Sequence, residues 1–236
     1  MIPEKVPRHI GIILDGNRRF AKKLMLKPWM GHEWGVKKFW SFLEWCKELL
    51  VEEVTAYAFS VQNFNRPKAE FDYLMDLFVK EFSELKSQGF AKFNDAGVRV
   101  MFIGRIWMFP EPVQQLMRDT MEATKHNTAY RANFAMAYGG REEVIDAVKK
   151  LGEDIKTGKV DIGKLNEEVF GTYLYLNSDP ELIIRTGGEK RTSNFLPWQG
   201  IYSEWFFLEK TWPEIEKPDL VAVLEEFQQR DRRFGK

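Results

Sequence analysis

Short apolar runs rich in β-branched residues alternate along this chain with longer segments whose apolar positions repeat at helical spacing. Residues 10–14, 54–60, 98–103, 133–137, 182–185 and 205–208 predict strands. Residues 32–50, 70–85, 110–125, 142–151, 165–176 and 219–230 predict helices. This alternation predicts one α/β domain over residues 1–236, in which helices flank a mostly parallel sheet of about six strands. Ligands of such sheets bind beyond the carboxyl ends of the strands.

The predicted helix at 32–50 is apolar on nearly two faces. One stripe contains Val36, Phe39, Trp40, Leu43, Cys46 and Leu50, and a second contains Trp34, Phe42, Trp45 and Leu49. A surface helix needs only one apolar face. The second face therefore packs against another element or subunit, or lines a hydrocarbon-binding cleft, and the two interpretations are compatible. The 19 Phe, 8 Trp and 7 Tyr leave the same choice between a well-filled core and an apolar ligand channel.

Composition excludes several classes of function. Lys plus Arg equals Asp plus Glu, 35 each, which argues against a general nucleic-acid binder. Cys46 is the single cysteine, so an internal disulfide is impossible and a reducing, cytoplasmic location is expected. The first residues lack a long apolar stretch, so neither a signal peptide nor a membrane span is expected. The spacing of His9, His32 and His126 predicts no metal cluster.

Polar residues follow three of the predicted strands. The first strand leads into Asp15-Gly16-Asn17 and then Arg18 and Arg19, which reads as a tight turn and a helical start. Free backbone N–H groups at a helix start, with arginines beside them, suit a diphosphate. Asp15 is suited to Mg²⁺, which needs only one or two carboxylates when phosphates complete its coordination.

The other two strand ends carry arginine as well. Asn63 and Arg66 follow the strand at 54–60. Arg185 ends the strand at 182–185, and Arg191 and Ser193 follow a flexible glycine pair. A site that binds two diphosphates and one metal ion explains the arginines at three strand ends better than simple exposure to solvent does.

Five motifs in these positions resemble the cis-prenyltransferase family, typified by undecaprenyl diphosphate synthase. They are H-I-G-I-I-L-D-G-N-R-R-F-A-K-K, G-H at 31–32, A-F-S-V-Q-N-F-N-R-P-K-A-E, Y-G-G-R at 138–141 and I-R-T-G-G-E-K-R-T-S-N-F-L-P-W-Q-G-I-Y-S-E. The resemblance extends from residue 9 to about 213. It implies a Mg²⁺-dependent enzyme, usually a homodimer, that condenses an allylic prenyl diphosphate with isopentenyl diphosphate and releases pyrophosphate. The longer polyprenyl diphosphate would serve lipid-carrier or isoprenoid biosynthesis.

The resemblance also implies roles for individual residues. Asp15 matches the essential metal-linked aspartate, and Asn63 matches the position that assists proton removal. Gly16, Asn17, Arg18, Arg19 and Phe20, with His32, match the allylic diphosphate loop. Ser60, Val61, Gln62, Phe64 and Arg66 belong to a mobile loop, and Arg185, Arg191, Thr192 and Ser193 match the isopentenyl diphosphate pocket. Glu204 matches a second Mg²⁺ ligand, reached from the neighbouring subunit's terminal region or from its own chain. A hydrophobic tunnel is implied between the sheet and the helices at 32–50 and 70–85.

Three positions depart from the family pattern. Pro28 stands where an arginine is usual, with Lys27 beside it as a point charge, and Gln62 and Phe64 replace a usual Glu and Trp. These changes fit either neutral drift in an archaeal-like or otherwise divergent branch, or an altered primer or acceptor. Product length and peripheral membrane contact through the product are left open.

Two other classes of function compete with this interpretation. A non-catalytic partner subunit is disfavoured because Asp15, both loop arginines and Glu204 are present. A nucleotide binder is disfavoured because neither G-x-x-x-x-G-K-[ST] nor G-x-G-x-x-G follows a predicted strand.

Overall fold

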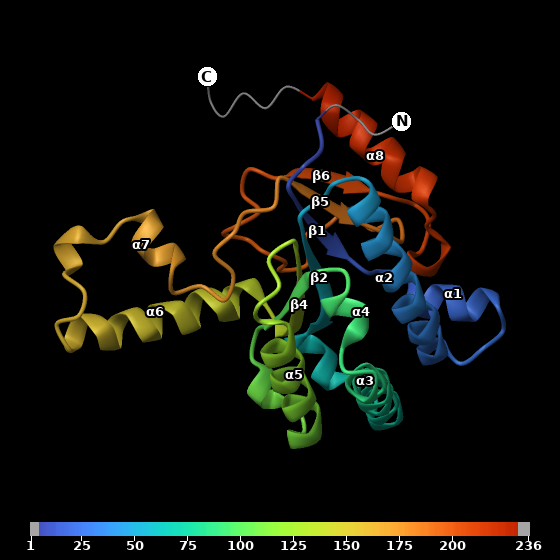
Figure 1. The fold of residues 1–236 in the computed structure, drawn as a ribbon, viewed down its shortest axis with the longest axis horizontal. Helices are drawn as coiled ribbons and strands as arrows, with labels where there is room; N and C mark the ends of the chain where they lie inside the picture. Colours follow the sequence, from blue (N-terminus) through green and yellow to red (C-terminus); the bar gives the residue numbers. More distant parts are fainter. Residues whose placement is uncertain (1–4, 231–236) are drawn as a thin grey trace.

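Six parallel strands form one sheet at the centre of the molecule (Figure 1). The computed structural model describes residues 5–230. The strands are β1 (His9–Ile13), β2 (Glu53–Ser60), β3 (Val98–Ile103), β4 (Tyr130–Tyr138), β5 (Leu182–Arg185) and β6 (Glu204–Phe207), in the spatial order β3-β4-β2-β1-β5-β6. Every neighbouring pair is parallel. The α/β class and the six predicted strands are confirmed, and the sheet is wholly parallel.

β1 lies where the chain changes direction across the sheet. β2, β4 and β3 lie on one side of it, and β5 and β6 lie on the other. The register places Ile13 opposite Tyr57 of β2 and Arg185 of β5. The loops that follow β1, β2 and β5 therefore emerge together at the carboxyl edge. Open parallel sheets bind their ligands at such a switch point.

The helices are α1 (Asn17–Lys23), α2 (Gly31–Glu48), α3 (Lys68–Ser87), α4 (Ala91–Asn94), α5 (Glu111–Thr124), α6 (Gly140–Lys156), α7 (Glu167–Gly171) and α8 (Lys217–Gln229). Most of them pack on one face of the sheet. Ile10 and Ile12 point to this face and are buried with Phe39 of α2 and Leu224 of α8. Further along the same face, Val100 of β3 is buried in a second cluster with side chains from α3, α4 and α5.

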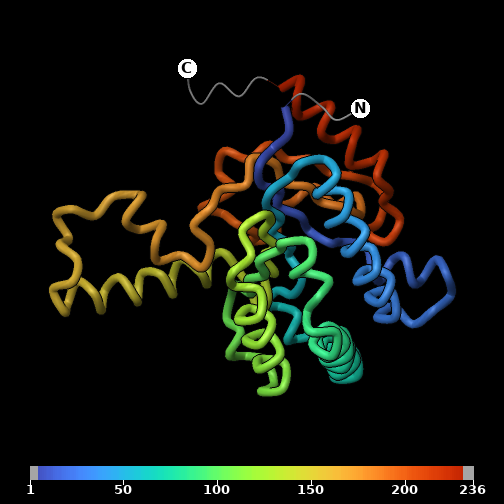
Figure 2. The backbone as a smooth tube through the Cα atoms, in the orientation of Figure 1, coloured from blue at the N-terminus to red at the C-terminus, as the bar shows by residue number. Residues whose placement is uncertain are grey.

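The opposite face is covered largely by irregular chain. Ile13 and Ile183 point to it and are buried with Tyr138, Phe195 and Leu196. The α6–α7 hairpin projects away from the sheet, as Figure 2 shows. No helix within residues 5–230 is both long and apolar enough to cross a bilayer.

The prediction of a helix at 165–176 is wrong for most of that segment. α7 covers only Glu167–Gly171, with Asn166 capping its start through a hydrogen bond from the Val169 N–H. The backbone N–H groups of Tyr175 and Leu176 instead donate to the buried carboxylate of Glu143. This tertiary partner replaces the bonds that a continuing helix would make, because each buried N–H needs one acceptor.

Candidate active site

Asp15 stands at the carboxyl end of β1, between two arginines. Its Oδ1 accepts a hydrogen bond from Arg19 Nη2 at 3.0 Å, and its Oδ2 accepts one from Arg185 Nη2 at 2.8 Å. Gly16, which follows, has φ = +106°, and a Cβ there would lie 2.6 Å from the Cβ of Thr211. Only glycine therefore lets the chain turn sharply enough to start α1 directly beyond Asp15.

Arg185 organises the loop after β5. Its side chain is buried, and its Nη1 donates to Ser193 Oγ at 2.6 Å and to the Arg191 carbonyl at 2.5 Å. Its Nε has no hydrogen-bond partner among the described residues. A buried guanidinium that holds both Asp15 and Ser193 ties the first predicted phosphate loop to the second.

The segment after β2 forms a short 3-10 helix, Val61–Asn65. The Ser60 N–H donates to Asn63 Oδ1 at 2.9 Å, and the Ser60 side chain caps the helix in return. Beyond it, Arg66 Nη1 lies 3.3 Å from His32 Nε2 and pairs with Glu70 at the start of α3. The loop after β2 is thus joined to α2 and α3 at one point.

His32 is an uncharged acceptor in this arrangement. Burial, together with the Arg66 and Arg18 guanidinium groups, lowers the pKa of His32 to about 3. Because arginine can only donate, the Nε2 that faces Arg66 is the unprotonated nitrogen. Glu70 balances the two arginines: it is buried, bonds Arg66, and lies 3.7 Å from Arg18 Nη2.

These loops surround a polar cavity of ≈ 420 Å³. Its lining residues are Leu14, Asp15, Gly16, Asn17, Arg18, Arg19, Lys22, His32, Arg66, Glu189 and Arg191. Five cations face two carboxylates there, Asp15 and Glu189. The excess of positive charge suits diphosphate groups.

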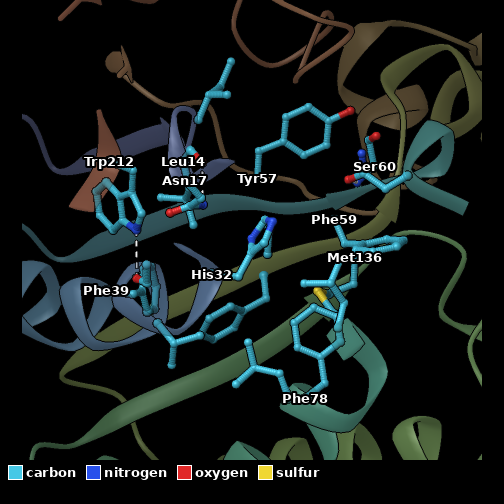
Figure 3. A pocket seen from close by; sticks show the side chains of 18 of the residues that line it. Leu14, Asn17, His32, Phe39, Tyr57, Phe59, Ser60, Phe78, Met136 and Trp212 are labelled. Atoms are coloured by element: carbon cyan, nitrogen blue, oxygen red, sulfur yellow. Dashed lines mark hydrogen bonds between the residues drawn. The ribbon is translucent and has the colours of Figure 1, made fainter. Parts of the chain in front are cut away.

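An apolar cavity of ≈ 390 Å³ opens from the same residues into the space between the sheet, α2 and α3. Asp15, Asn17, His32, Arg66 and Arg191 line both cavities. The deeper walls are hydrocarbon, and Figure 3 shows Phe39, Phe59, Phe78 and Met136 on them, with His32 nearer the polar end. Tyr57, Ser60, Asn63 and Arg185 also line this cavity. A charged mouth thus leads into an apolar interior.

Some predicted residues lie outside both linings in the described chain. They are Phe20, Val61, Gln62, Phe64, Thr192 and Ser193. Phe20 packs against Trp34, and Phe64 joins an aromatic cluster with Phe59, Phe71 and Phe109. Ser193 reaches the site through Arg185. Pro28 starts a short 3-10 helix, Pro28–Met30.

Glu204 does not reach Asp15 within one chain. It begins β6 and pairs in register with Leu182, which in turn pairs with Ile10. Asp15 lies five positions beyond Ile10, roughly 16 Å along the strand direction. Glu204 instead bonds Arg230 at 2.8 Å. The neighbouring-subunit route to the metal stays a prediction.

Several residues at the site were not predicted to act there. They are Tyr57, Glu70, Glu189 and Trp212. The Trp212 side-chain Nε1 donates to the Gly35 carbonyl at 2.8 Å, and the Trp212 backbone N–H donates to the Asp15 carbonyl at 2.9 Å. The four-residue spacing of Arg66 and Glu70 is a signal for an ion pair, and the two do pair although Arg66 precedes α3. Trp212 follows the motifs and carried no such signal.

The donor set fits one Mg²⁺ delivered with a diphosphate. Within residues 5–230, no cluster of three or more His, Cys, Asp or Glu is arranged to hold a metal ion. Mg²⁺ retains waters and commonly binds one or two carboxylates plus substrate phosphates. The Asp15 carboxylate lines both cavities and is suited to that role.

Comparison with known proteins agrees with this geometry. The family model for undecaprenyl diphosphate synthases matches residues 13–235. The chain is 45% identical over 234 residues to a tritrans,polycis-undecaprenyl-diphosphate synthase (geranylgeranyl-diphosphate specific) of Methanopyrus kandleri, covering 98% of this chain and 86% of that protein. The synthase of the same description from Pyrococcus horikoshii is 46% identical over 233 residues, covering 98% and 88%. A crystal structure of lavandulyl diphosphate synthase from Lavandula x intermedia, in complex with dimethylallyl diphosphate, matches with a TM-score of 0.92 at 30% identity, covering 98% and 99%.

Proposed function

Because this chain belongs to the undecaprenyl diphosphate synthase family, we infer that it is a cis-prenyltransferase that joins an allylic prenyl diphosphate to isopentenyl diphosphate. The observation that carries the inference is the arginine-lined cavity that opens directly into an apolar one. Such a pair accepts two pyrophosphate heads and one growing hydrocarbon tail. The product is a longer cis-polyprenyl diphosphate, and pyrophosphate is released.

The loop after β1 holds the allylic diphosphate in this proposal. Arg18 and Arg19 stand at the first turn of α1, where free backbone N–H groups and the helix dipole favour anions. Arg185, Arg191 and Ser193 hold the second diphosphate at the neighbouring loop. When Mg²⁺ is bound, held by Asp15, it supplies further positive charge at the departing pyrophosphate.

The reaction breaks the allylic C–O bond, and the electron pair leaves with pyrophosphate. The double bond of the acceptor attacks the allylic carbon, and the new C–C bond forms. A proton then leaves the acceptor carbon to a base. Asn63 lines the apolar cavity, but an amide is a poor base, so we assign it the positioning of the acceptor and of a diphosphate oxygen that takes the proton. Aromatic walls around the reacting carbon exclude water that would intercept the cation.

We further propose a long allylic primer. The archaeal relatives are described as geranylgeranyl-diphosphate specific, and this chain shares more than two fifths of their residues. Pro28 stands where the family usually has an arginine, in the segment before His32. Binding of the allylic diphosphate therefore depends more on Arg18 and Arg19. The apolar cavity supports binding of a long tail. A changed primer is favoured over neutral drift on these grounds.

We propose that the active form is a homodimer in which Glu204 contributes to the partner's metal site. Two observations support this: Glu204 is remote from Asp15 within one chain, and exposed apolar residues stand in the segment that leads into β6. Ile201 and Tyr202, just before Glu204, are 72% and 69% exposed. Apolar exposure of this degree is typical of an interface between subunits.

Product analysis by mass tests the function. Purified protein is incubated with Mg²⁺, labelled isopentenyl diphosphate and allylic primers of two, three and four isoprene units. We expect cis-polyprenyl products, formed most efficiently from the four-unit primer and abolished by chelation of Mg²⁺. Asp15→Asn preserves size and should remove activity, while Asp161→Asn, on the α6–α7 connection, should not. Full turnover by Asp15→Asn would refute the assigned site.

A further inference from the structure

The connection between α1 and α2 exposes apolar side chains beside the charged mouth. Met25 is 96% exposed, Leu24 47% and Trp34 37%. We call these three residues, with the half-buried Trp29 of the intervening turn, the apolar patch. Figure 1 shows this connection at the edge of the molecule, beyond α1. Isolated exposed apolar residues are ordinary, but several that lie close together in the sequence on one projecting segment indicate an interaction surface.

The backbone at Met25 holds an exposed apolar side chain in a strained conformation. The Leu26 N–H donates to the Ala21 carbonyl at 3.0 Å, and the Met25 N–H donates to the Lys22 carbonyl at 3.0 Å. This pair of bonds is the Schellman motif that ends many helices, and it puts Met25 at the position where glycine is usual. Met25 accordingly has φ = +56°. Both the strain and the exposure disfavour methionine there, as they do Leu50, where the same motif ends α2.

Charge surrounds the apolar patch. Residues 18–38 contain seven Lys and Arg (Arg18, Arg19, Lys22, Lys23, Lys27, Lys37 and Lys38) but a single acid, Glu33, in a chain with 35 of each sign. Arg18, Arg19 and Lys22 line the polar cavity, and Lys23 pairs with Glu214. Lys27 lies outside both cavities, with its Nζ 5.6 Å from the Trp29 ring. Cations that flank exposed Trp, Leu and Met are the signature of a segment that enters an anionic lipid interface.

The geometry points to a docking surface for an anionic lipid bilayer, formed by the apolar patch and Lys27. Apolar tips enter the headgroup region and the cations contact lipid phosphates, each worth about a several-fold gain in affinity. The choice of a bilayer over another partner rests on the proposed function, because a long prenyl diphosphate resides in lipid.

Docking at this surface places the mouth of the site at the membrane. The segment is tied to the site at both ends: Arg18 and Lys22 precede it and His32 follows it, and all three line the polar cavity. α1 packs against both the intervening turn and α2, so a Cβ on Gly31 would lie 2.0 Å from the Asn17 carbonyl oxygen. A rigid segment of this kind holds the cavity entrance at a set height above the lipid.

A fluorescent label tests insertion directly. Cys46 is buried, and burial raises the pKa of its thiol, so a thiol-reactive solvatochromic dye will label Met25→Cys selectively. We expect the dye emission to shift to the blue on adding phosphatidylcholine–phosphatidylglycerol vesicles and to shift little with phosphatidylcholine alone. Met108→Cys, on the 3-10 helix Ile106–Met108, is the matched control and should not respond. An unresponsive label at position 25 overturns the proposal.

Vesicle sedimentation measures the affinity of the protein for the membrane. Leu24→Ser/Met25→Ser and, separately, Lys27→Glu should each weaken binding to the anionic vesicles about tenfold. Met108→Ser and Lys156→Glu make equivalent changes elsewhere and should bind like the parent protein. Equal binding by all variants refutes the surface. A blue shift that depends on protein concentration without vesicles would assign the surface to a second copy of the chain instead, and would also refute it.

Activity separates this proposal from the proposed function. Turnover of a short, water-soluble primer without vesicles should be the same in Leu24→Ser/Met25→Ser as in the parent, because neither residue lines the polar or the apolar cavity of the site. If neither the parent nor the double variant transferred prenyl groups, the result would count against the proposed function. The vesicle-binding measurements would still decide whether the surface binds lipid. Loss of vesicle binding together with unchanged turnover is the result expected here.

Discussion

Trp40 is the wall between the apolar cavity and a second cavity of ≈ 200 Å³, because it lines both. Lys92 Nζ lies 3.8 Å from the centre of its ring, and the Phe93 ring centroid lies 5.2 Å away. Trp40→Ala should remove this wall and join the two spaces. Ala132, Val54 and Cys46 line the second cavity, so a hydrocarbon tail would meet apolar walls there.

The size of the second cavity sets the expected effect. At the ~30 Å³ that a water molecule occupies in the liquid, it holds on the order of six or seven groups of that size. If each chain carbon takes about that volume, the product of Trp40→Ala gains roughly one five-carbon unit. Loss of the partly buried ring should lower the free energy of unfolding, by less than the ~3–5 kcal/mol typical of fully buried aromatics.

Mass spectrometry of the products at a fixed ratio of primer to isopentenyl diphosphate measures the change. Trp45→Ala removes a second tryptophan from α2 without opening either cavity, and its products should match those of the parent. An unchanged product distribution from a folded, active Trp40→Ala protein would refute the role of Trp40 as a wall.

Three further outcomes follow from contacts already described. Arg185→Lys keeps the charge but loses the fork that joins Asp15 to Ser193, so steady-state assays should show kcat/KM at least tenfold lower, with native-like circular dichroism. Glu70→Ala leaves Arg66 without its buried partner and should lower the free energy of unfolding in urea by about 3 kcal/mol, whereas Asp72→Ala on the same helix should cost well under 1 kcal/mol. Burial lowers the pKa of His9 to about 4, so the unfolded state binds a proton first as pH falls below 6.5. His9 alone should then lower the stability by about 1.4 kcal/mol per pH unit from pH 6.5 to 4, and a His9→Gln variant titrated in parallel should show a slope shallower by about that amount.

The sequence predicted the sheet well because its strands are buried on both faces and read as continuous apolar runs. All five residues of β1 are buried, and such a run leaves little ambiguity. The prediction of a helix at 165–176 failed because the conformation of this segment depends on Glu143, which is distant in the sequence. No local pattern reveals the hydrogen bonds that this carboxylate accepts.

The site was predicted unevenly for a similar reason. Asp15, Arg185 and His32 follow strand ends or match motifs, so their convergence could be anticipated. Glu189 lies within the last motif, between Arg185 and Arg191, but its approach to Arg19 depends on how two loops pack. Trp212 lies outside the motifs and reaches the site through packing of a loop remote in sequence, about which periodicity says nothing. Glu204 matches a motif but lies far along β6 from Asp15, since a motif gives residue order and not distance.

The apolar cavity lies along the seam between two separate parts of the core. Phe39 and Trp212 belong to the part built on α2 and α8, while Leu74 and Phe82 belong to the part built on α3 and α5, and all four face the cavity. A bound prenyl chain would fill that seam and serve as core that the polypeptide does not supply. Each added isoprene unit should therefore raise the melting temperature of the complex, until the tail outgrows the space available to it.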